Sequence, residues 1–409
     1  MIHGPYYPRA LVVLEPILSD LNTQVPREKR TARIELEPRS VAVDRNPVEM
    51  ADTCRCDFEF ARFPMDPRAI RDIRVSVYID DVKTPLRKVT ANRSALRFVG
   101  FVDLPENSHD GKGDWTSLSA RDYRGRLLDT PFGSAGVDAT RPISQIARAA
   151  VRAVPGYEDF QITVDNDVTL RDYTDKSTWT PPAGASIWDV LVMIAHTVGQ
   201  VPWFDLDALR IGNPRGADDG EVKILRFGEN VRDMTFRRNM NPMARKAVQI
   251  RGTDPNTRKV TTARWPVKPV SGESVIAFPT TSPENASQLQ ERARRVYEAR
   301  ERAQIEGTVS TGAMQDSAGA DLLALMAGDG VLVNYRDAST DHLLGESEQS
   351  IADRMTASGI DSETARTLAR AYINAAELRP LFYVRKSAIR WSRSDFGISI
   401  DVENFVDTG

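Results

Sequence analysis

Residues 95–132 read ALRFVGFVDLPENSHDGKGDWTSLSARDYRGRLLDTPF, and this stretch decides the predicted fold. Apolar and polar residues alternate before and after a polar segment that contains two glycines. This alternation predicts a β-hairpin of two antiparallel strands with a long tip around residues 107–113. After Tyr123 the alternation stops, and we expect a charged turn at residues 124–126 before a different kind of structure begins.

Gly100 lies inside the first strand of this hairpin. A glycine inside a strand often marks a bulge, or a place where another backbone or an aromatic ring lies close. A glycine that the strand merely tolerates is the alternative. The sequence leaves both interpretations open.

Short segments with the same alternation precede the hairpin. Residues 31–43 carry apolar residues around Pro38, which predicts a strand that is interrupted or turns a corner. Residues 53–61 and 73–79 alternate cleanly. Short half-buried strands with polar turns between them predict a β-barrel or sandwich rather than a parallel sheet.

Cys54 and Cys56 are the only cysteines of the chain. Their spacing puts both side chains on one face of the predicted strand, beside Phe58 and Phe60. Two thiols cannot complete a tetrahedral zinc site, and a disulfide between them would be strained. We therefore expect two buried, reduced thiols.

The middle of the chain predicts a mixed α/β segment. Apolar residues at helical spacing predict helices at 142–154 and 186–198, the second with Ser186 as its N-cap. Strands are expected at 160–164 and, on both sides of a turn, within 201–211.

The rest of the chain predicts a return to strands. We expect a strand pair at 225–236, a strand at 247–252 that opens a third region, a turn and strand at 325–335, and at least two strands within 381–406. The longest predicted helix covers 283–306, and its arginines are offset by glutamates, which indicates a solvated face. No internal repeat is visible as sequence identity.

Residues 339–380 have a helical pattern, with predicted helices at 351–358 and from Asp361 onward. Two short helices bury little apolar surface between themselves. We expect this helical insertion to contact another component of an assembly. The alternative is that it packs on its own barrel.

The composition is that of a soluble protein with two or three domains, with 409 residues, 41% hydrophobic and 27% charged. With 54 basic and 57 acidic residues the net charge is −3, so no basic excess points to nucleic acid as the main partner. The longest early apolar run, residues 10–14, is too short for a signal-peptide core or a membrane-spanning helix. We expect binding to neither nucleic acid nor membrane.

No constellation of residues indicates catalysis. Of four histidines, His196 is on a predicted helix, where we expect it to pack at the helix edge. No phosphate-binding loop, dinucleotide fingerprint or H-E-x-x-H zinc motif occurs. Residues 165–167 and 205–207 carry paired aspartates, but they lack the glycine and glutamate of an EF-hand loop. We expect no enzyme activity, and no catalytic, cofactor-binding or metal-binding residues.

The order of elements around residues 95–132 resembles the first barrel of the baseplate hub family of contractile phage tails. The pattern is F-x-G-x-V, a long hairpin, S-x-x-A-R-D-Y and L-L-D. Relatives include the late control gene D proteins and the hub part of the VgrG proteins of type VI secretion. The matching positions are Phe98, Gly100, Val102, Leu118, Asp122 and Leu128.

This resemblance implies a mainly β fold with α+β insertions, built on two small antiparallel β-barrels like those of tail tubes. It divides the chain into a first barrel (1–125 and 200–245), a small α/β insertion (126–199) and a second barrel (246–409) that carries the helical insertion. It also implies a structural role in the virion tail baseplate, after assembly in the host cytoplasm.

The implied assembly is a homotrimer whose six barrels form a pseudo-sixfold ring between the hexameric tail tube and the trimeric central spike. The implied partners are therefore further copies of the chain, the tail tube protein and the spike protein. Baseplate wedge or other hub-proximal proteins could join them.

Two other functions stay open. A carbohydrate-binding or carbohydrate-degrading tail-tip protein would gather aromatic residues such as Trp115, Trp179 and Trp203 in one groove, and would need a suitable carboxylate pair. A VgrG-like hub of a secretion system is the second alternative, although its usual spike β-helix is not visible in this sequence.

Overall fold

The computed structural model describes most of the chain. The described residues are 7–16, 33–47, 50–59, 72–82, 88–110, 113–133, 136–154, 157, 160–174, 177–198, 200–212, 222–238, 247–253, 260–268, 275–279, 305–316, 318–334, 348–376 and 381–403, with single positions between 286 and 297.

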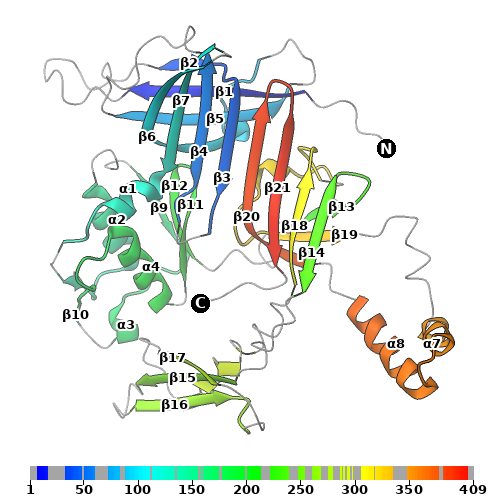
Figure 1. Cartoon of the computed structure of the whole chain (residues 1–409). Helices are drawn as coiled ribbons and strands as arrows, with labels where there is room; N and C mark the ends of the chain where they lie inside the picture. Colours follow the sequence, from blue (N-terminus) through cyan, green and yellow to red (C-terminus); the bar gives the residue numbers. More distant parts are fainter. Residues whose placement is uncertain are drawn as a thin grey trace, which may run out of the picture.

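A single 13-stranded sheet forms the body of the protein (Figure 1). Its main path runs through β14 (Asp233–Arg238), β18 (Ile305–Thr311), β21 (Phe396–Glu403), β20 (Leu381–Ser392), β3 (Ser40–Arg45), β4 (Thr53–Glu59), β7 (Gly113–Asp122), β6 (Leu96–Asp110), β5 (Ile73–Asp81), β1 (Pro8–Pro16) and β2 (Ile34–Leu36). Off this path, β19 (Gly330–Asn334) pairs with β20, and β13 (Lys223–Arg226) pairs with β19.

The centre of this sheet consists of two units with the same strand order. The first four-strand unit is β3–β4–β7–β6, and the second four-strand unit is β14–β18–β21–β20. In each unit the first two strands pair, and a later hairpin adds its second strand beside them. All pairings inside both units are antiparallel. The chain therefore contains a structural repeat that sequence identity does not reveal.

The two units also agree in register. One row across each unit shows the match: Val43, Cys54, Ala120 and Val102 lie opposite one another in the first, and Phe236, Gly307, Val402 and Val384 in the second. Directly after these rows, each last strand carries a β-bulge, at residue 103 in β6 and at residue 385 in β20. A bulge bends and twists its strand, so both units share the same local geometry.

The alternation of side chains turns one face of each unit toward an apolar core. Alternate residues of β3 and β4, such as Val43 and Cys54, are buried in one apolar core that extends through both barrels. Strands β5, β1 and β2 complete the first barrel, while β19 and β13 complete the second. Most pairings are antiparallel as predicted, but β13 and β19 run parallel. The predicted mainly β fold with two barrels and helical insertions is confirmed.

The two cysteines behave as predicted. Cys54 and Cys56 are buried in this core as free thiols, with 3.6 Å between their Sγ atoms. Burial raises the pKa of the Cys54 thiol, so the neutral form is favoured.

The α/β insertion packs around a second apolar core, to which Leu96, Val99 and Phe101 of β6 contribute. It contains α1 (Tyr123–Asp129), α2 (Ile143–Arg152), α3 (Arg171–Thr174), α4 (Ile187–Thr197), a sheet of β11 (Val201–Asp205), β12 (Ala208–Gly212) and β9 (Gln161–Val164), and a short pair of β8 (Val137–Asp138) and β10 (Thr178–Trp179). Ser186 caps α4 in a capping box with Asp189, which confirms the predicted N-cap. The Tyr157 hydroxyl donates to the Tyr123 carbonyl at 2.7 Å and so ties this core to the start of α1.

Two smaller pieces complete the described structure. Strands β15 (Ala247–Thr253), β16 (Val260–Trp265) and β17 (Val275–Pro279) form a separate sheet. The predicted helix pair is present as α7 (Glu348–Ala357) and α8 (Ser362–Ala376), which share a small apolar cluster. The predicted helix at 283–306 lies largely outside the described residues, and its last two positions belong to β18.

Four local expectations need correction. Residues 124–126 are not a turn, because Asp122 accepts a hydrogen bond from the Arg124 amide and starts α1 there. The hairpin tip is short, since β6 and β7 stay paired from Gly100 to Asp110. Residues 225–236 hold two strands that do not pair with each other. Residues 8–16, considered only as a targeting segment, form β1.

Gly100 is a close-approach position. A Cβ atom there would lie 2.1 Å from the Arg121 carbonyl oxygen and 2.8 Å from Cζ of Phe98. We therefore expect Gly100→Ala to reduce the free energy of unfolding by ~2–3 kcal/mol, because the paired strand must move. Urea unfolding followed by circular dichroism measures this. Gly133→Ala, at a site with no heavy atom within 4 Å, is the matched control, and equal effects of both substitutions would contradict the explanation.

Candidate functional site: the joint between the two barrels

The two barrels meet where β3 pairs with β20. These strands are antiparallel, with Ser387 opposite Arg45 at one end and Ser392 opposite Ser40 at the other. Figure 1 shows β3 beside β20, so strands from near the two ends of the sequence lie together. On the solvent side, the Arg390 guanidinium donates to both carboxylate oxygens of Asp44, at 2.8 and 3.0 Å. This joint turns two barrels into one sheet.

The side chain of Arg45, at one end of this ladder, points inward, and the residue is only 4% exposed. Its guanidinium donates to the Leu325 carbonyl of the second barrel at 2.6 Å and to the Arg97 carbonyl of the first at 3.1 Å. The Ser387 hydroxyl donates to the same Leu325 carbonyl at 2.9 Å. Burial lowers the pKa of Arg45, while the charge of Asp52 opposes this shift. The planar fork of arginine lets one side chain hold both barrels.

Arg97 makes a second link across the joint. Its Nε donates to the Ile79 carbonyl in the first barrel at 3.1 Å. Its terminal nitrogen lies 2.9 Å from the Asp321 carboxylate of the second barrel. Burial lowers the pKa of Arg97, and Asp321 counteracts that effect. Two buried arginines, one on β3 and one on β6, thus reach the same segment of the second barrel.

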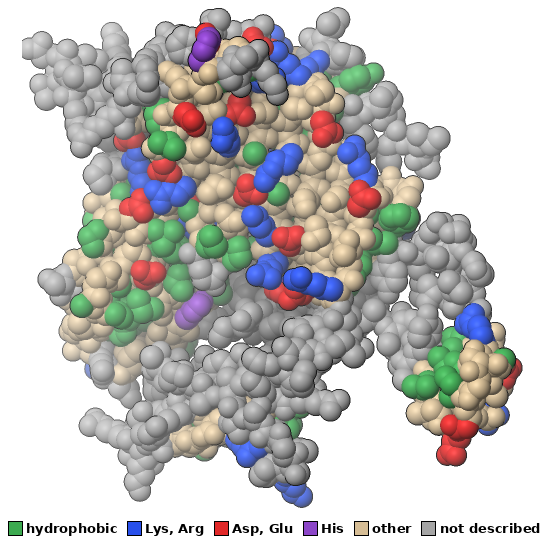
Figure 2. All heavy atoms as spheres, in the orientation of Figure 1, with side chains coloured by type: hydrophobic (Ala, Val, Ile, Leu, Met, Phe, Trp, Pro, Cys, Tyr) green, Lys and Arg blue, Asp and Glu red, His purple; other side chains and the backbone are tan. Residues whose placement is uncertain are grey.

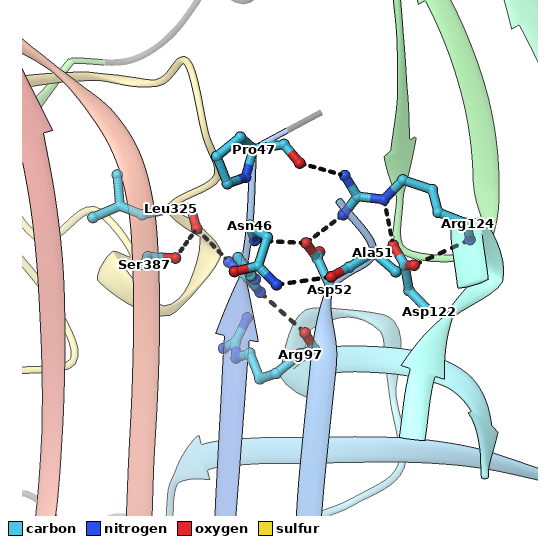
Figure 3. A network of polar contacts seen from close by, with 10 residues as sticks. Asn46, Pro47, Ala51, Asp52, Arg97, Asp122, Arg124, Leu325 and Ser387 are labelled. Atoms are coloured by element: carbon cyan, nitrogen blue, oxygen red, sulfur yellow. Dashed lines mark hydrogen bonds and ion pairs between the residues drawn. The ribbon is translucent and has the colours of Figure 1, made fainter. Parts of the chain in front are cut away.

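A third buried arginine ties the α/β insertion to the same place. Arg124 binds Asp122 at 2.7 Å, and it also pairs with Asp52 and donates to the Pro47 carbonyl at 3.3 Å (Figure 3). Asp52 in turn accepts from the Asn46 amide at 2.8 Å, directly after β3. Burial raises the pKa of Asp122 to about 7, against the pull of Arg124, and the charge of Asp52 adds to the rise.

The sequence signal for this site is only partly readable. Asp122 was among the positions of the family resemblance, and it proves to cap α1 and hold Arg124. In β3 the side chains of Val41, Val43 and Arg45 all point inward. A charged residue at an inward position indicates a buried polar network, and it is the signal that the sequence offers here. Nothing in the sequence pairs it with Leu325, which lies 280 residues away.

The paired aspartates considered for calcium have other roles. Asp167 accepts hydrogen bonds from the amide and hydroxyl of Ser144 at 2.9 and 2.6 Å, at the start of α2. Asp205 and Asp207 pair with Arg210 and Arg93. His196 is exposed near the end of α4. Among the described residues, no three His, Cys, Asp or Glu side chains gather where they could hold a metal ion.

The solvent face of the central sheet is polar. Asp57 accepts hydrogen bonds from the hydroxyls of Ser40 and Ser117, both at 2.6 Å, and Thr308 donates to Asp401 at 2.9 Å. Figure 2 shows Lys and Arg side chains interspersed with Asp and Glu across the middle of the molecule. A sheet with one apolar and one polar face can line a water-filled space or lie open to solvent.

The fold is shared with phage tail proteins and with a chain of a PdpA–VgrG complex. A tail protein from Neisseria meningitidis MC58 superposes with a TM-score of 0.62 at 15% identity, covering 97% of each chain. The 43 kDa tail protein of prophage MuSo2 from Shewanella oneidensis gives 0.56 at 13% identity, covering 96% of this chain and 98% of that one. A Francisella PdpA–VgrG complex gives 0.53 at 10% identity, covering 98% of this chain and 58% of that one.

Sequence comparison adds no relative. No protein-family model matches the chain, and no curated protein matches it. In the part of the chain that the structure describes, no helix is both long and apolar enough to cross a membrane.

The Arg45 bridge can be tested with a change that keeps the charge. Arg45→Lys should lower the free energy of unfolding by ~2 kcal/mol, because an ammonium group cannot reach both carbonyls in the geometry of the fork. Chemical denaturation measures the loss. Arg55→Lys, on the neighbouring strand with a side chain 57% exposed, should change the stability by less than ~0.5 kcal/mol. If the two variants were equally stable, the bridge would not hold the barrels together.

Asp122 should make the stability depend on pH. The pKa of its carboxyl is about 7 in the folded chain, against the ordinary value of 3.8. The folded chain therefore binds this proton more tightly than the unfolded chain does. The stabilisation that this proton gives to the folded state is therefore fully present below pH 3.8 and is lost as the pH rises through about 7. Asp122→Asn cannot titrate, so its urea midpoint should fall less than that of the wild type between pH 4 and 8.

The control is Asp129→Asn, also on α1. Hydrogen bonds from Arg121 lower the pKa of Asp129, so its titration lies at lower pH and the slope between pH 4 and 8 should stay that of the wild type. Parallel curves for the wild type and Asp122→Asn would show that Asp122 does not titrate in this interval.

Proposed function

We propose that the chain is the structural baseplate hub of a phage or phage-like tail. In this role three copies form a pseudo-sixfold ring that joins the hexameric tail tube to the trimeric central spike. The observation that carries the proposal is the repeat of the four-strand unit, with the two copies joined head to tail through β3 and β20. The ring lies in the virion tail, and it assembles in the host cytoplasm.

Symmetry explains why a hub needs this repeat. A threefold spike and a sixfold tube cannot share one interface unless the adaptor offers six similar surfaces on three chains. Two similar units per chain supply them. The units differ in their insertions, which leaves three α/β insertions and three helix pairs available for threefold contacts.

The joint also suits an adaptor whose parts must keep fixed relative positions. Arg45, Arg97 and Arg124 connect both barrels and the α/β insertion through buried hydrogen bonds. Removal of one partner from such a network is costly, so the relative position of the three parts is strongly fixed. We therefore propose a scaffold without catalytic turnover.

The alternatives have less support. For a carbohydrate site, Trp115, Trp179 and Trp203 would need to share a groove, but they belong to the first barrel, to the β8–β10 pair and to the sheet of the insertion. A VgrG-like hub of a secretion system is favoured by the likeness to one chain of a PdpA–VgrG complex, 58% of which is covered. Both hubs would use the same ring.

Particle mass and symmetry test the proposal. We expect light scattering of the purified protein at high concentration to give three times the 45.5 kDa chain mass, and cryo-electron microscopy of native tails to place the chain in a threefold ring between tube and spike. A ring with another symmetry, or a position away from the tube axis, would refute the proposal. Cleavage of peptidoglycan or capsular polysaccharide that is lost when one carboxylate is neutralised would refute the scaffold role.

A further inference from the structure

Two strand edges remain open in the repeated sheet. Within the described residues, β14 pairs only with β18, and residues 104–110 of β6 pair only with β7. An open edge presents backbone N–H and C=O groups that readily pair with another strand. The two edges therefore need either a partner or protection.

The two open edges correspond to the two edges that already pair inside the chain, those of β20 and β3. β20 is the last strand of the second unit, and β6 holds the same place in the first. β3 and β14 are both first strands. We infer that β6 of one copy pairs with β14 of a second copy, in the arrangement that joins β20 to β3. This inference rests on the proposed ring, of which it is the seam between chains.

Strand direction permits this seam. The path from β14 to β6 has eight strands, and each runs antiparallel to its neighbour. Because eight is even, β6 of one copy meets β14 of the next in the antiparallel sense. The contact is head to tail, so it closes into a ring if the rotation between copies divides a full turn.

The shared register predicts which residues meet. Inside the chain, Ala388 lies opposite Asp44 and Arg390 opposite Ala42. Counted from the two bulges, Glu106 and Ser108 correspond to Ala388 and Arg390. Counted along the two six-residue first strands, Arg237 and Thr235 correspond to Asp44 and Ala42. The seam therefore places Glu106 opposite Arg237, and Ser108 opposite Thr235.

Charge supports this register. Glu106 is exposed, and the Arg237 side chain is 80% exposed beside Glu306. Opposite charges that face each other across antiparallel strands stabilise the pair. The internal joint also pairs opposite charges across the two strands, diagonally, through Arg390 and Asp44. Pro105 removes one backbone donor from β6, which disfavours indiscriminate pairing and leaves more of the specificity to the charges.

Incomplete burial points to the same seam. In β3, which has a strand on each side, Val41 and Val43 are 2% and 0% exposed. The corresponding Met234 and Phe236 of β14 are only half-buried. Leu104 of β6 is 61% exposed at the other open edge. A strand added at each edge would remove these apolar side chains from water.

An engineered disulfide tests the register. Side chains directly opposite in an antiparallel pair have Cβ atoms about 4.5–5.5 Å apart, near the range that a disulfide spans. With Ser108→Cys and Thr235→Cys in one chain, mild oxidation by copper phenanthroline should link chains into covalent trimers on a non-reducing gel. The expected yield is at least ~10-fold above that of either single variant.

Two controls keep this test specific. Ser108→Cys with Thr308→Cys moves the second thiol one strand away from the seam, because Thr308 lies opposite Thr235 on β18, and should give no link. Ala42→Cys with Arg390→Cys marks the corresponding internal pair and should give a disulfide within one chain.

The outcomes separate the seam from the proposed function. Trimers by light scattering without this cross-link would overturn the seam and leave the hub in place. Cross-linked chains in a number other than three would keep the seam and refute the threefold ring. Because oxidation traps even brief contacts, an absence of linked chains at about millimolar concentration would overturn the seam.

A charge exchange gives a second, reversible measurement. Glu106→Arg or Arg237→Glu alone should weaken association by roughly fivefold per seam, since like charges then face each other. The double variant restores opposite charges and should recover association to within about twofold. If the double variant is as weak as the worse single one, Glu106 does not face Arg237.

Discussion

The antiparallel ladder between β3 and β20 is the contact on which the rest of the structure depends. It joins the two barrels into one sheet with one apolar interior. Backbone hydrogen bonds alone would allow the strands to slip by two residues without exchanging faces. Arg45 and Arg97 remove that freedom, because Arg45 donates to the Leu325 carbonyl and Arg97 pairs with the Asp321 carboxylate, both on the opposite barrel.

Buried charge at this joint contributes more to specificity than to stability. Taking a guanidinium out of water costs free energy, and the hydrogen bonds around Arg45 and Arg124 largely offset that cost. An apolar joint could be as stable, but it would tolerate several relative positions of the barrels. The proposed hub would match two symmetries, and a joint that permits one relative position of the barrels suits that role.

The sequence predicts local structure well where one face of an element is buried. The alternation in β4 and β7, the capping box at Ser186 and the helix pair α7–α8 are all readable, because period and cap residues follow directly from local geometry. β1 was missed because its apolar run, residues 10–14, was considered only as a targeting signal. The start of α1 was missed because Gly125 and two arginines are typical of a turn.

The site itself is less predictable, for a physical reason. Strand pairing across hundreds of residues is decided by the whole fold, and neither β13 with β19 nor β3 with β20 carries a local signal. The repeat is also hidden from sequence comparison: the rows through Val43 and Phe236 match in position, but only their last members, Val102 and Val384, are the same residue. What the two units share is the strand order, the register and the position of the bulge.

The distance between β3 and β20 along the chain affects how the protein folds. The hydrogen bond from Arg390 to the Val43 carbonyl spans 347 residues, so the joint has a very high contact order and is expected to form late. During synthesis β3 leaves the ribosome long before β20 exists, so the edge of β3 that later pairs with β20 stays open. A nascent chain at this stage is expected to be the form most prone to aggregation. Productive folding then requires the β20–β21 hairpin to form and pair with β3 before a strand of another chain pairs with the same edge of β3.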